Sequence, residues 1–532
     1  MACVSLTPPA AVIILAAGQG TRMKSATPKV LHRIAGRSLL GHVLHSARGI
    51  SPERVAVVVR HEREAVAAHA RELAPAVVIA DQDEIPGTGR AVECGLLTLD
   101  DAVQSAALAD RDERDPLQAV DGGVSGPVVI LAGDVPLLDA GTLAALVEAH
   151  SADQNAITVL TTILEDPTGY GRVVRDAEGQ IAKIVEHRDA SPDELAIKEM
   201  NSGVYVMDSE VLRSALARVD RNNDQGEVYL TDVMALARSE GRAVRAVVTD
   251  DPMLVEGVND RVQLATLGAE LNRRIVIEWM RAGVTVVDPA TTWIDGDVRL
   301  SPDVALLPGT QLHGATTVAT GATIGPDTTL TDVEIGEGAT VIRTHGSGSR
   351  IGAGATVGPF TYLRPGLNLG ERGKLGAFVE VKNSEIGAGS KVPHLSYIGD
   401  ATIGEESNIG AASVTVNYDG VHKHRTVIGS YARTGADNMF VAPVRVGDGA
   451  YTGAGTVVRR DVPAGSLGVT TGNQRNIEGW TASRRPGTPA AEAAARAIEQ
   501  PLSPQAQAEA SRREGTSEPA AGADPGAPVT SE

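Results

Sequence analysis

Short apolar runs alternate with longer segments of mixed polarity through the first half of the chain. Five such runs can be recognised, at residues 11–15, 55–59, 77–80, 128–132 and 157–161. Continuous β-branched runs of this length are typical of buried parallel strands. The pattern therefore predicts an α/β Rossmann-like domain over residues 1–261, with helices on both faces of a parallel sheet and ligands at the carboxyl ends of its strands.

A different spacing follows this domain. Leu267, Leu271, Ile275 and Trp279 recur every four positions, which places them on one face of a helix. The spacing predicts a helical linker over residues 262–282.

After the linker, apolar residues recur every six positions. If Ile, Leu and Val filled roughly a quarter of all positions, six successive hits would arise by chance in about one frame in four thousand. Two such series occur: Leu300, Leu306, Leu312, Val318, Ile324 and Leu330, then Ile351, Val357, Leu363, Leu369, Leu375 and Val381. The pattern continues to Val446 with five-residue steps and one break at residues 417–426. Three six-residue repeats form one coil of a parallel β-helix, which we expect over residues 283–484.

Composition limits the possible partners and compartment. The formal net charge of -19 argues against a nucleic-acid surface, which requires clustered Lys and Arg. The two cysteines, Cys3 and Cys94, do not suggest a disulfide framework, and no apolar run approaches the roughly 18 residues of a membrane span. We expect a cytoplasmic protein without membrane insertion. Residues 101–126 are expected to form a surface insertion and residues 485–532 a disordered tail.

The first apolar run opens directly into a turn of small residues. The turn comprises Leu15, Ala16, Ala17, Gly18, Gln19 and Gly20, and Arg22 and Lys29 follow it. Small side chains allow backbone N–H groups to surround a phosphate, while Arg22 and Lys29 add positive charge. Two glycines alone also occur in ordinary βα turns, so the basic pair is what favours a phosphate site.

The pattern L-A-A-G-x-G-T-R-M followed by P-K resembles the signature of the sugar-nucleotidylyltransferases. The resemblance continues in order through PGTG at 86–89, LAGDVP at 131–136, GYGR at 169–172, VEH at 185–187 and VEGVN at 255–259. This set is similar to the first half of the bifunctional N-acetylglucosamine-1-phosphate uridylyltransferases and glucosamine-1-phosphate acetyltransferases. The resemblance implies transfer of uridylyl from UTP to N-acetylglucosamine-1-phosphate with the help of Mg²⁺.

The same resemblance implies roles for individual residues. Lys29 would contact the phosphate at the reacting centre and Arg22 the leaving pyrophosphate, while Asp134 and Asn259 would hold Mg²⁺. The substrate positions are Gln82, Gly87 and Thr88 for uracil, Gly171, Glu186 and Asn201 for the amino sugar, and Ala132 and Gly133 beside Asp134. A plain turn after a strand remains the alternative for Asp134, and strand-edge polar pairing the alternative for Glu186 and Asn201.

Four segments of the predicted β-helix resemble the acetyltransferase half of the same family: LRPG at 363–366, FVEVK at 378–382, HLSYIGD at 394–400 and NYDG at 417–420. His394 is the candidate general base, because imidazole titrates near neutrality, although a lone histidine in a repeat is usually a corner residue. The resemblance implies Arg364 and Lys382 for the phosphate of glucosamine-1-phosphate, Tyr397 and Asn408 for its sugar, and Ala411, Asn417, Tyr418, Ala436 and Ala454 for acetyl-coenzyme A. It also implies a left-handed β-helix and a homotrimer.

Three departures from the family pattern concern the acetyl donor. Ala436 stands where the family usually has Ser, Thr471 stands where an Arg commonly meets the cofactor phosphates, and the segment 411–413 reads A-A-S in place of A-G-T. Loss of a charged hydrogen bond weakens binding by roughly tenfold or more. We therefore expect an unusually high Michaelis constant for acetyl-coenzyme A.

Three functions remain compatible with these features. The leading hypothesis is an enzyme with two active sites that makes UDP-N-acetylglucosamine, a cell-wall precursor. A nucleotidylyltransferase whose β-helix serves only assembly or regulation is the second, and His394 with the loop at Asn417 argues against it. A non-catalytic scaffold is the third, and it is disfavoured because Lys29, Asp134, Glu186 and Asn259 are all present.

Overall fold

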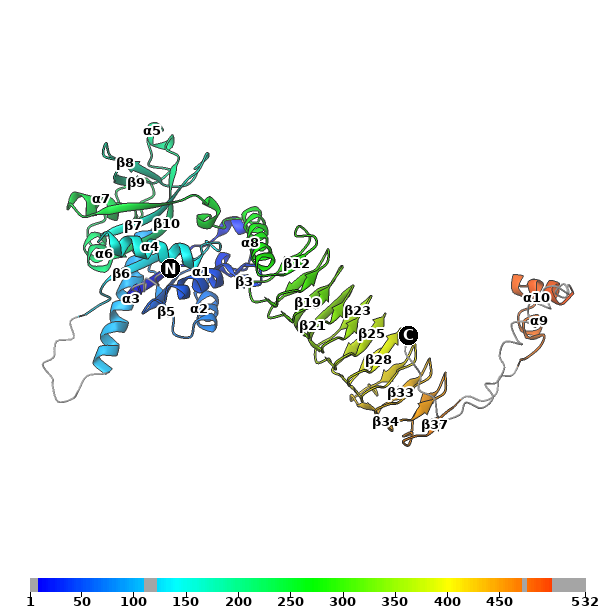
Figure 1. Ribbon diagram of the computed structural model, residues 1–532. Coiled ribbons are helices and arrows are strands. Elements are labelled where there is room, and N and C mark those ends of the chain that lie inside the picture. Colours follow the sequence, from blue (N-terminus) through cyan, green and yellow to red (C-terminus); the bar gives the residue numbers. More distant parts are fainter. Residues whose placement is uncertain (1–7, 110–121, 471–475, 500–532) are drawn as a thin grey trace. The chain divides into compact units, whose positions relative to one another are not determined.

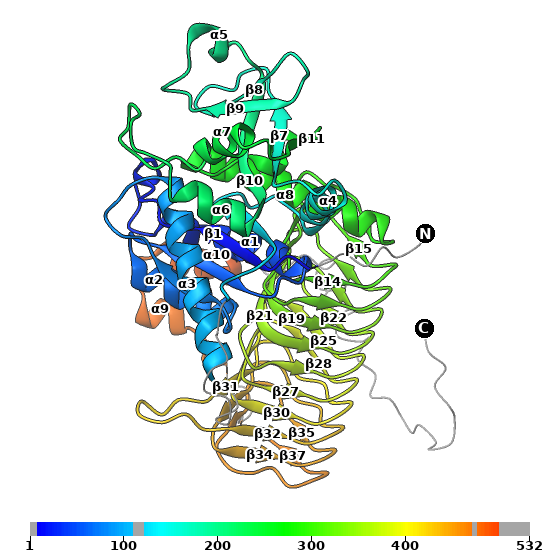
Figure 2. The ribbon, with the colours of Figure 1, turned by 90° about the vertical axis from the view of Figure 1, so that its left-hand side faces the viewer.

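The computed structural model describes residues 8–109, 122–470 and 476–499. The chain forms two compact units, residues 1–470 and 471–532. The larger unit contains an α/β domain, one long helix and a stack of short strands (Figures 1 and 2).

The α/β domain is built on a sheet with the strand order β11-β7-β10-β6-β1-β4-β5, and β8 pairs with β10 and β9 at its side. The strands are β1 (Ala11–Leu15), β4 (Val55–Val59), β5 (Val78–Asp81), β6 (Pro127–Ala132), β7 (Ile157–Ile163), β8 (Arg172–Arg175), β9 (Ile181–Val185), β10 (Glu199–Asp208) and β11 (Val244–Thr249). The main helices are α1 (Leu39–Gly49), α2 (Arg63–Leu73), α3 (Thr88–Ala109), α4 (Ala140–Ala152), α6 (Ser209–Leu216) and α7 (Asp232–Ser239).

Strand β1 lies at the centre of this sheet and is covered on both faces. Val12 and Ile14 pack with α1, α2 and α4, whereas Ile13 packs with α3, α6 and α7. All three side chains are fully buried. A continuous apolar run is the expected sequence for a strand covered in this way, and the predicted α/β class is confirmed.

Part of the sheet differs from the prediction of a parallel arrangement. β10 runs antiparallel to both β6 and β7, and β8 and β9 form an antiparallel hairpin. The physical reason lies in residues 164–198, which form only this hairpin and one turn of helix, α5 (Pro192–Leu195). A parallel connection needs a crossover, usually a helix, so the chain returns in the opposite direction instead.

The long helix α8 (Arg261–Arg281) is the helix that the four-residue spacing predicts. Leu267 is buried against the α/β domain, while Ile275 and Trp279 pack against the core of the strand stack. Buried Asn272 fixes the helix to the first coil, because its amide donates to the Thr292 carbonyl at 2.8 Å and accepts from the Ile294 N–H at 2.9 Å.

The strand stack is a parallel β-helix. Its first face contains β12 (Thr285–Val286), β15 (Ala305–Leu306), β18 (Thr323–Ile324), β20 (Thr340–Val341), β22 (Thr356–Val357), β25 (Lys374–Ala377) and β28 (Lys391–His394). The other two faces run from β13 (Trp293–Ile294) to β36 (Val457–Val458). Trp293 pairs with Gln311 and Gln311 with Thr329, so one coil takes eighteen residues, which is three repeats of six.

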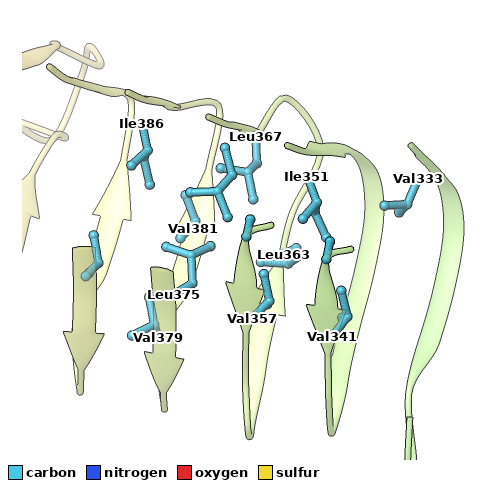
Figure 3. Close-up of a cluster of buried hydrophobic side chains, with 14 of the residues drawn as sticks. Val333, Val341, Ile351, Val357, Leu363, Leu367, Leu375, Val379, Val381 and Ile386 are labelled. Atoms are coloured by element: carbon cyan, nitrogen blue, oxygen red, sulfur yellow. The ribbon is translucent and has the colours of Figure 1, made fainter. Parts of the chain in front are cut away.

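The six-residue series form the interior of this β-helix. Every residue of the two series is buried, and Figure 3 shows several of them, including Val357, Leu363 and Val381, packed in one cluster. The break at 417–426 corresponds to a loop between β31 (Val414–Val416) and β32 (Thr426–Ile428). The β-helix predicted from periodicity is therefore confirmed.

The sequence predicted irregular structure for the insertion at residues 101–126 and the tail at residues 485–532. The described parts of both segments contain helix. α3 continues to Ala109, into the predicted insertion, and residues 110–121 lie outside the described part. α9 (Trp480–Arg484) and α10 (Pro489–Glu499) occur near the end of the chain, and α10 is alanine-rich, which favours a helix without a core. Neither of these two helices buries a residue, and residues 500–532 lie outside the description.

Candidate active sites

The turn after β1 forms the base of the first site. The Gly133 N–H donates to the Leu15 carbonyl at 2.9 Å, which holds the ends of β1 and β6 side by side. Gly20 has a φ of 64°, and a Cβ atom at this position would lie 2.6 Å from the Cβ of Lys29. Glycine is therefore required at position 20 for the chain to pass close to Lys29.

Four predicted residues converge above this turn from three distant segments. Lys29, in η2 (Lys29–Leu31), places its Nζ 2.5 Å from Asp134 Oδ2 and 3.5 Å from Asn259 Oδ1. Arg22, in η1 (Thr21–Met23), donates from Nη2 to the same Asn259 oxygen at 2.9 Å. The side chains of Lys29 and Asp134 are only 15% and 16% exposed. The structure thus brings together the two cations and the two proposed metal ligands.

The donor atoms in this cluster fit a magnesium ion. Asp134 and Asn259 present oxygen atoms that already meet at one cationic group, and Mg²⁺ prefers oxygen ligands, keeping several waters and substrate phosphates. No group of three His, Cys, Asp or Glu side chains suited to a metal occurs among the described residues. A site with one carboxylate and one amide ligand is not a group of that kind, so this finding does not bear on a magnesium site at Asp134 and Asn259.

The predicted uracil segment forms a compact loop between β5 and α3. The Gln82 amide donates to the carbonyls of Ile85 and Gly87, at 3.0 and 3.2 Å. A Cβ atom on Gly87 would lie 2.3 Å from the Val228 carbonyl oxygen, so this loop needs glycine there. The Thr88 hydroxyl accepts from the Leu230 N–H at 3.2 Å. Gln82 therefore orders the loop through its amide group and leaves its carbonyl oxygen available.

The three predicted amino-sugar residues lie in one row of neighbouring strands. Arg172 pairs with Val185 on β9 and with Met200 on β10, so Gly171, Glu186 and Asn201 are each one residue away from this register position. The Asn201 N–H donates to the Gly171 carbonyl at 2.9 Å. Burial raises the pKa of Glu186, and nearby carboxylates add to the effect, whereas a hydrogen bond from Thr231 opposes it.

Arg172 lies in the same row of strand positions, and no role was predicted for it from the sequence. Its side chain is 2% exposed, its Nη1 donates to the Tyr170 carbonyl, and its Nε has no partner among the described residues. Burial lowers the pKa of the Arg172 guanidinium. A buried cation at this point holds the turn before Gly171, and its place in the GYGR segment was the only available signal.

The second candidate site lies on the β-helix around Asp400. The Asp400 carboxylate accepts from the Asn383 and Asn417 amides at 2.6 and 2.5 Å, and Lys382 Nζ lies 3.7 Å from it. Burial alone would raise the pKa of Asp400, but these hydrogen bonds and the nearby lysines lower it. Tyr397 joins the cluster through its hydroxyl, 3.4 Å from the Asn417 amide.

Two further cations border this cluster. Arg364 Nη1 donates to Glu380 Oε1 at 3.0 Å on the neighbouring coil. Lys423 lies beside Lys382, and the hydrogen bond and charge of that neighbouring ammonium lower the pKa of Lys423. Lys423 was not predicted from the sequence, because it lies in the loop that interrupts the six-residue repeat, where periodicity assigns no position.

His394 begins a column of small residues on successive coils. Ala377 pairs with His394, the Ala412 N–H donates to the His394 carbonyl at 3.2 Å, and the Asp437 N–H donates to the Ala411 carbonyl at 2.7 Å. The Gly455 N–H donates in turn to the Ala436 carbonyl, at 2.8 Å. His394, Ala411, Ala436 and Ala454 therefore follow one another along the β-helix. The imidazole is exposed and makes no hydrogen bond within the described residues.

The contacts within the described chain do not support the predicted roles of three residues, Asn408, Tyr418 and Thr471. Asn408 bridges Lys391 and Arg433 on the first face, and its side chain makes no hydrogen bond to His394 or Tyr397 in the described part. Tyr418 is 56% exposed, and its hydroxyl donates to the Gly420 carbonyl. Thr471 lies outside the described residues, as does Cys3, so the effect expected at Thr471 stays a prediction. Cys94 is buried and forms no disulfide with any residue that the structure describes.

A membrane span can also be sought directly in the structure. None of the helices in the described part of the chain is long and apolar enough to cross a bilayer.

Comparison with known proteins identifies the family. Residues 12–202 match the family model of the MobA-like NTP transferase domain. The chain is 60% identical to the bifunctional protein GlmU of Pseudarthrobacter chlorophenolicus over 92% of this chain and 96% of that protein. It is 58% identical to the same-named protein of Kineococcus radiotolerans, over 92% and 95%, and 59% identical to that of Mycolicibacterium gilvum, over 91% and 94%. The chain belongs to the GlmU family of bifunctional proteins.

Proposed function

We propose that the two reactions of this bifunctional enzyme are divided between the two sites described above. The chain acetylates glucosamine-1-phosphate with acetyl-coenzyme A and transfers uridylyl from UTP to the product, which gives UDP-N-acetylglucosamine and pyrophosphate. The observation that best supports the first site is the convergence of Lys29, Asp134 and Asn259 from segments more than a hundred residues apart.

Uridylyl transfer depends mainly on charge neutralisation and alignment. We assign Lys29 to the phosphate at the reacting centre and Arg22 to the leaving pyrophosphate. The Lys29 ammonium and the Arg22 guanidinium would stabilise the negative charge that develops there in the transition state. Asp134 and Asn259 would hold Mg²⁺, which when bound neutralises phosphate oxygens. The loop at Gln82 would contact uracil, and Glu186 and Asn201 the amino sugar.

Acetyl transfer requires a base and an anchor for the sugar phosphate. We assign His394 to remove a proton from the attacking amine as its nitrogen bonds to the acetyl carbon and the thiolate of coenzyme A leaves. Arg364, Lys382 and Lys423 form a cationic group suited to the phosphate of glucosamine-1-phosphate. The column from Ala411 to Ala454 offers a surface without large side chains, along which extended acetyl-coenzyme A would lie.

An oligomer is supported by an exposed apolar corner of the β-helix. Phe360, Phe378 and Leu395 occupy equivalent corner positions on successive coils, with φ between 50° and 59°, and each is more than half exposed. The two phenyl rings stack with centroids 5.3 Å apart. Such a strip favours burial in an interface. We propose a homotrimer, which native mass spectrometry tests, and Phe378→Glu should shift the mass to the monomer.

The buried thiol Cys94 suits a reducing compartment, and we place the enzyme in the cytoplasm. A coupled assay with UTP and either sugar phosphate, with and without acetyl-coenzyme A, tests the division of labour. We expect UDP-N-acetylglucosamine from N-acetylglucosamine-1-phosphate without the acetyl donor, and from glucosamine-1-phosphate only with it. Product from N-acetylglucosamine-1-phosphate, but none from glucosamine-1-phosphate even with acetyl-coenzyme A, would instead favour a β-helix used only for assembly or regulation. No product from either sugar phosphate would favour a scaffold.

A further inference from the structure

A groove of about 700 Å³ lies where the α/β domain meets the first coils of the β-helix. Three segments line it: the short strand β2 (Arg33–Ile34), the beginning of α8, and the coils that contain β13 and β16 (Gln311–His313). None of the residues assigned to either reaction lines this groove. Its volume is within the range of sites that bind small organic molecules.

The rim of the groove carries an excess of positive charge. The Arg261 guanidinium makes no hydrogen bond or ion pair with any described residue, and the Arg33 guanidinium makes only a 3.5 Å hydrogen bond to the Gly36 carbonyl. The one carboxylate in the lining, Asp295, is already paired with His313, with 3.4 Å between Oδ2 and Nδ1. Two guanidinium groups without a carboxylate partner favour an anionic ligand.

The inner wall of the groove is apolar and contains an exposed aromatic ring. Ile34, Leu264 and Ile294 line it, and Trp293 beside them is 42% exposed. An indole ring offers a flat surface for stacking, and nearby guanidinium groups interact well with aromatic rings. The combination of a flat apolar wall and a cationic rim suits a planar ring that carries a negative group.

The same wall is continuous with the packing beneath the nucleotidyl site. Ile34 belongs to a small hydrophobic cluster with Met23 and Val258, and Leu264 packs against it. Met23 follows Arg22 in the chain and Val258 precedes Asn259. The contact between β2 and α8 is close, because a Cβ atom on Gly268 would lie 3.2 Å from Ile34. A ligand that displaces Ile34 or Leu264 would therefore shift the support of two residues of the nucleotidyl site.

We propose that this groove binds a small aromatic anion, with its ring against Trp293 and its charge between Arg33 and Arg261, and that the bound anion alters uridylyl transfer. The binding part stands on the groove alone, whereas the effect on activity rests on the proposed function. Acetyl transfer should be unaffected, since His394 lies several coils further along the β-helix.

The binding is tested with 8-anilinonaphthalene-1-sulfonate, whose fluorescence rises in apolar surroundings, added to the full-length protein saturated with UDP-N-acetylglucosamine. N-phenyl-1-naphthylamine, which lacks the sulfonate, is the neutral control. We expect Arg33→Gln and Arg261→Gln each to weaken binding of the sulfonate about tenfold. Trp293→Ala should weaken binding of both probes. Arg281→Gln, at an exposed site on α8 outside the groove, should leave both unchanged.

Equal sulfonate affinity in the wild type and the Arg33→Gln/Arg261→Gln variant, or no saturable binding at all, would overturn the proposed site. Uridylyl and acetyl transfer are then measured at saturating sulfonate. We expect at least a twofold change in the first rate, absent in the double variant, and no change in the second. Binding without this change overturns the coupling. An untreated wild type without uridylyl transfer would instead contradict the proposed function.

Discussion

The two candidate sites gather their residues in opposite ways. In the α/β domain, Lys29 meets Asp134 and Asn259 across 105 and 230 positions of sequence. On the β-helix, Arg364 and Glu380 are 16 positions apart, and Asn417 and Asp400 are 17, which is about one coil. The first site therefore depends on the topology of a whole sheet, whereas the second depends on the register between adjacent coils.

This difference predicts which substitutions would disrupt each site. A change in the α/β domain can separate the segments that carry the nucleotidyl residues without affecting any coil. The β-helix site, in contrast, should tolerate changes in distant coils, because each coil is held chiefly by its neighbours. The two reactions should accordingly be separable by single substitutions.

The largest separation is expected from Asp134→Ala. The change removes a proposed Mg²⁺ ligand and leaves Lys29 without its 2.5 Å partner. Loss of charge stabilisation at a transferring phosphoryl group costs about 10³- to 10⁵-fold in rate. We expect uridylyl transfer to fall by this factor while acetyl transfer persists, both measured with circular dichroism as a control for folding. Loss of both reactions in a folded variant would show that the two sites are not independent.

The converse substitution, His394→Ala, should lower acetyl transfer by about 10²- to 10⁴-fold, the usual worth of a positioned general base. The imidazole is exposed and has no hydrogen-bond partner to lose among the described residues, so stability should hardly change. Uridylyl transfer in the same preparation serves as the control. A drop below tenfold would mean that another group or water removes the proton, and His394 would then be only a corner residue.

The same contrast explains what could be predicted from sequence. Six-residue spacing located the buried apolar series from Leu300 to Leu330, because one coil repeats the environment of the next. It failed at Lys423, which lies in an irregular loop. In the α/β domain, the strand β1 was found because Val12, Ile13 and Ile14 form a continuous apolar run. The direction of β10 was not predicted, because it depends on the connection at residues 164–198, whose hairpin the apolar runs did not indicate. The site residues there came from the family resemblance, and Arg172 was missed because a buried charge has no distinctive spacing.

Acid should distinguish the two regions by stability. Burial lowers the pKa of His42, on α1, to about 4, despite a hydrogen bond to the Ile34 carbonyl. Below pH 6.5 the unfolded chain takes up a proton that the folded domain does not, so stability falls as pH drops from 6.5 towards 4. Between pH 7.5 and 5 this amounts to about 2 kcal/mol. None of the five histidines in the fully described stretch 283–470 is buried.

Hydrogen exchange measured at both pH values tests this contrast. Amides of β1 and β6 should lose protection at pH 5 to a much larger extent than amides of β25 and β28. His42→Gln should reduce the loss in the α/β domain, and His345→Gln, at an exposed position of the β-helix, is the matched control. Equal loss in both regions would contradict the assignment of the acid sensitivity to His42.

The smallest expected effect concerns the loop that interrupts the coils. Lys423 lies next to Lys382 and would add a third cation to the phosphate of glucosamine-1-phosphate. Because that phosphate carries the same charge before and during acetyl transfer, Lys423→Ala should raise KM about tenfold and leave kcat nearly unchanged. Lys391→Ala, which removes an exposed lysine of β28, should change neither constant. An unchanged KM in Lys423→Ala would place this lysine outside the site. A fall in kcat alone would show that Lys423 acts on the reacting amine. The loop between β31 and β32 would then contribute to the chemical step of acetyl transfer, which is otherwise assigned to His394 on the regular coils.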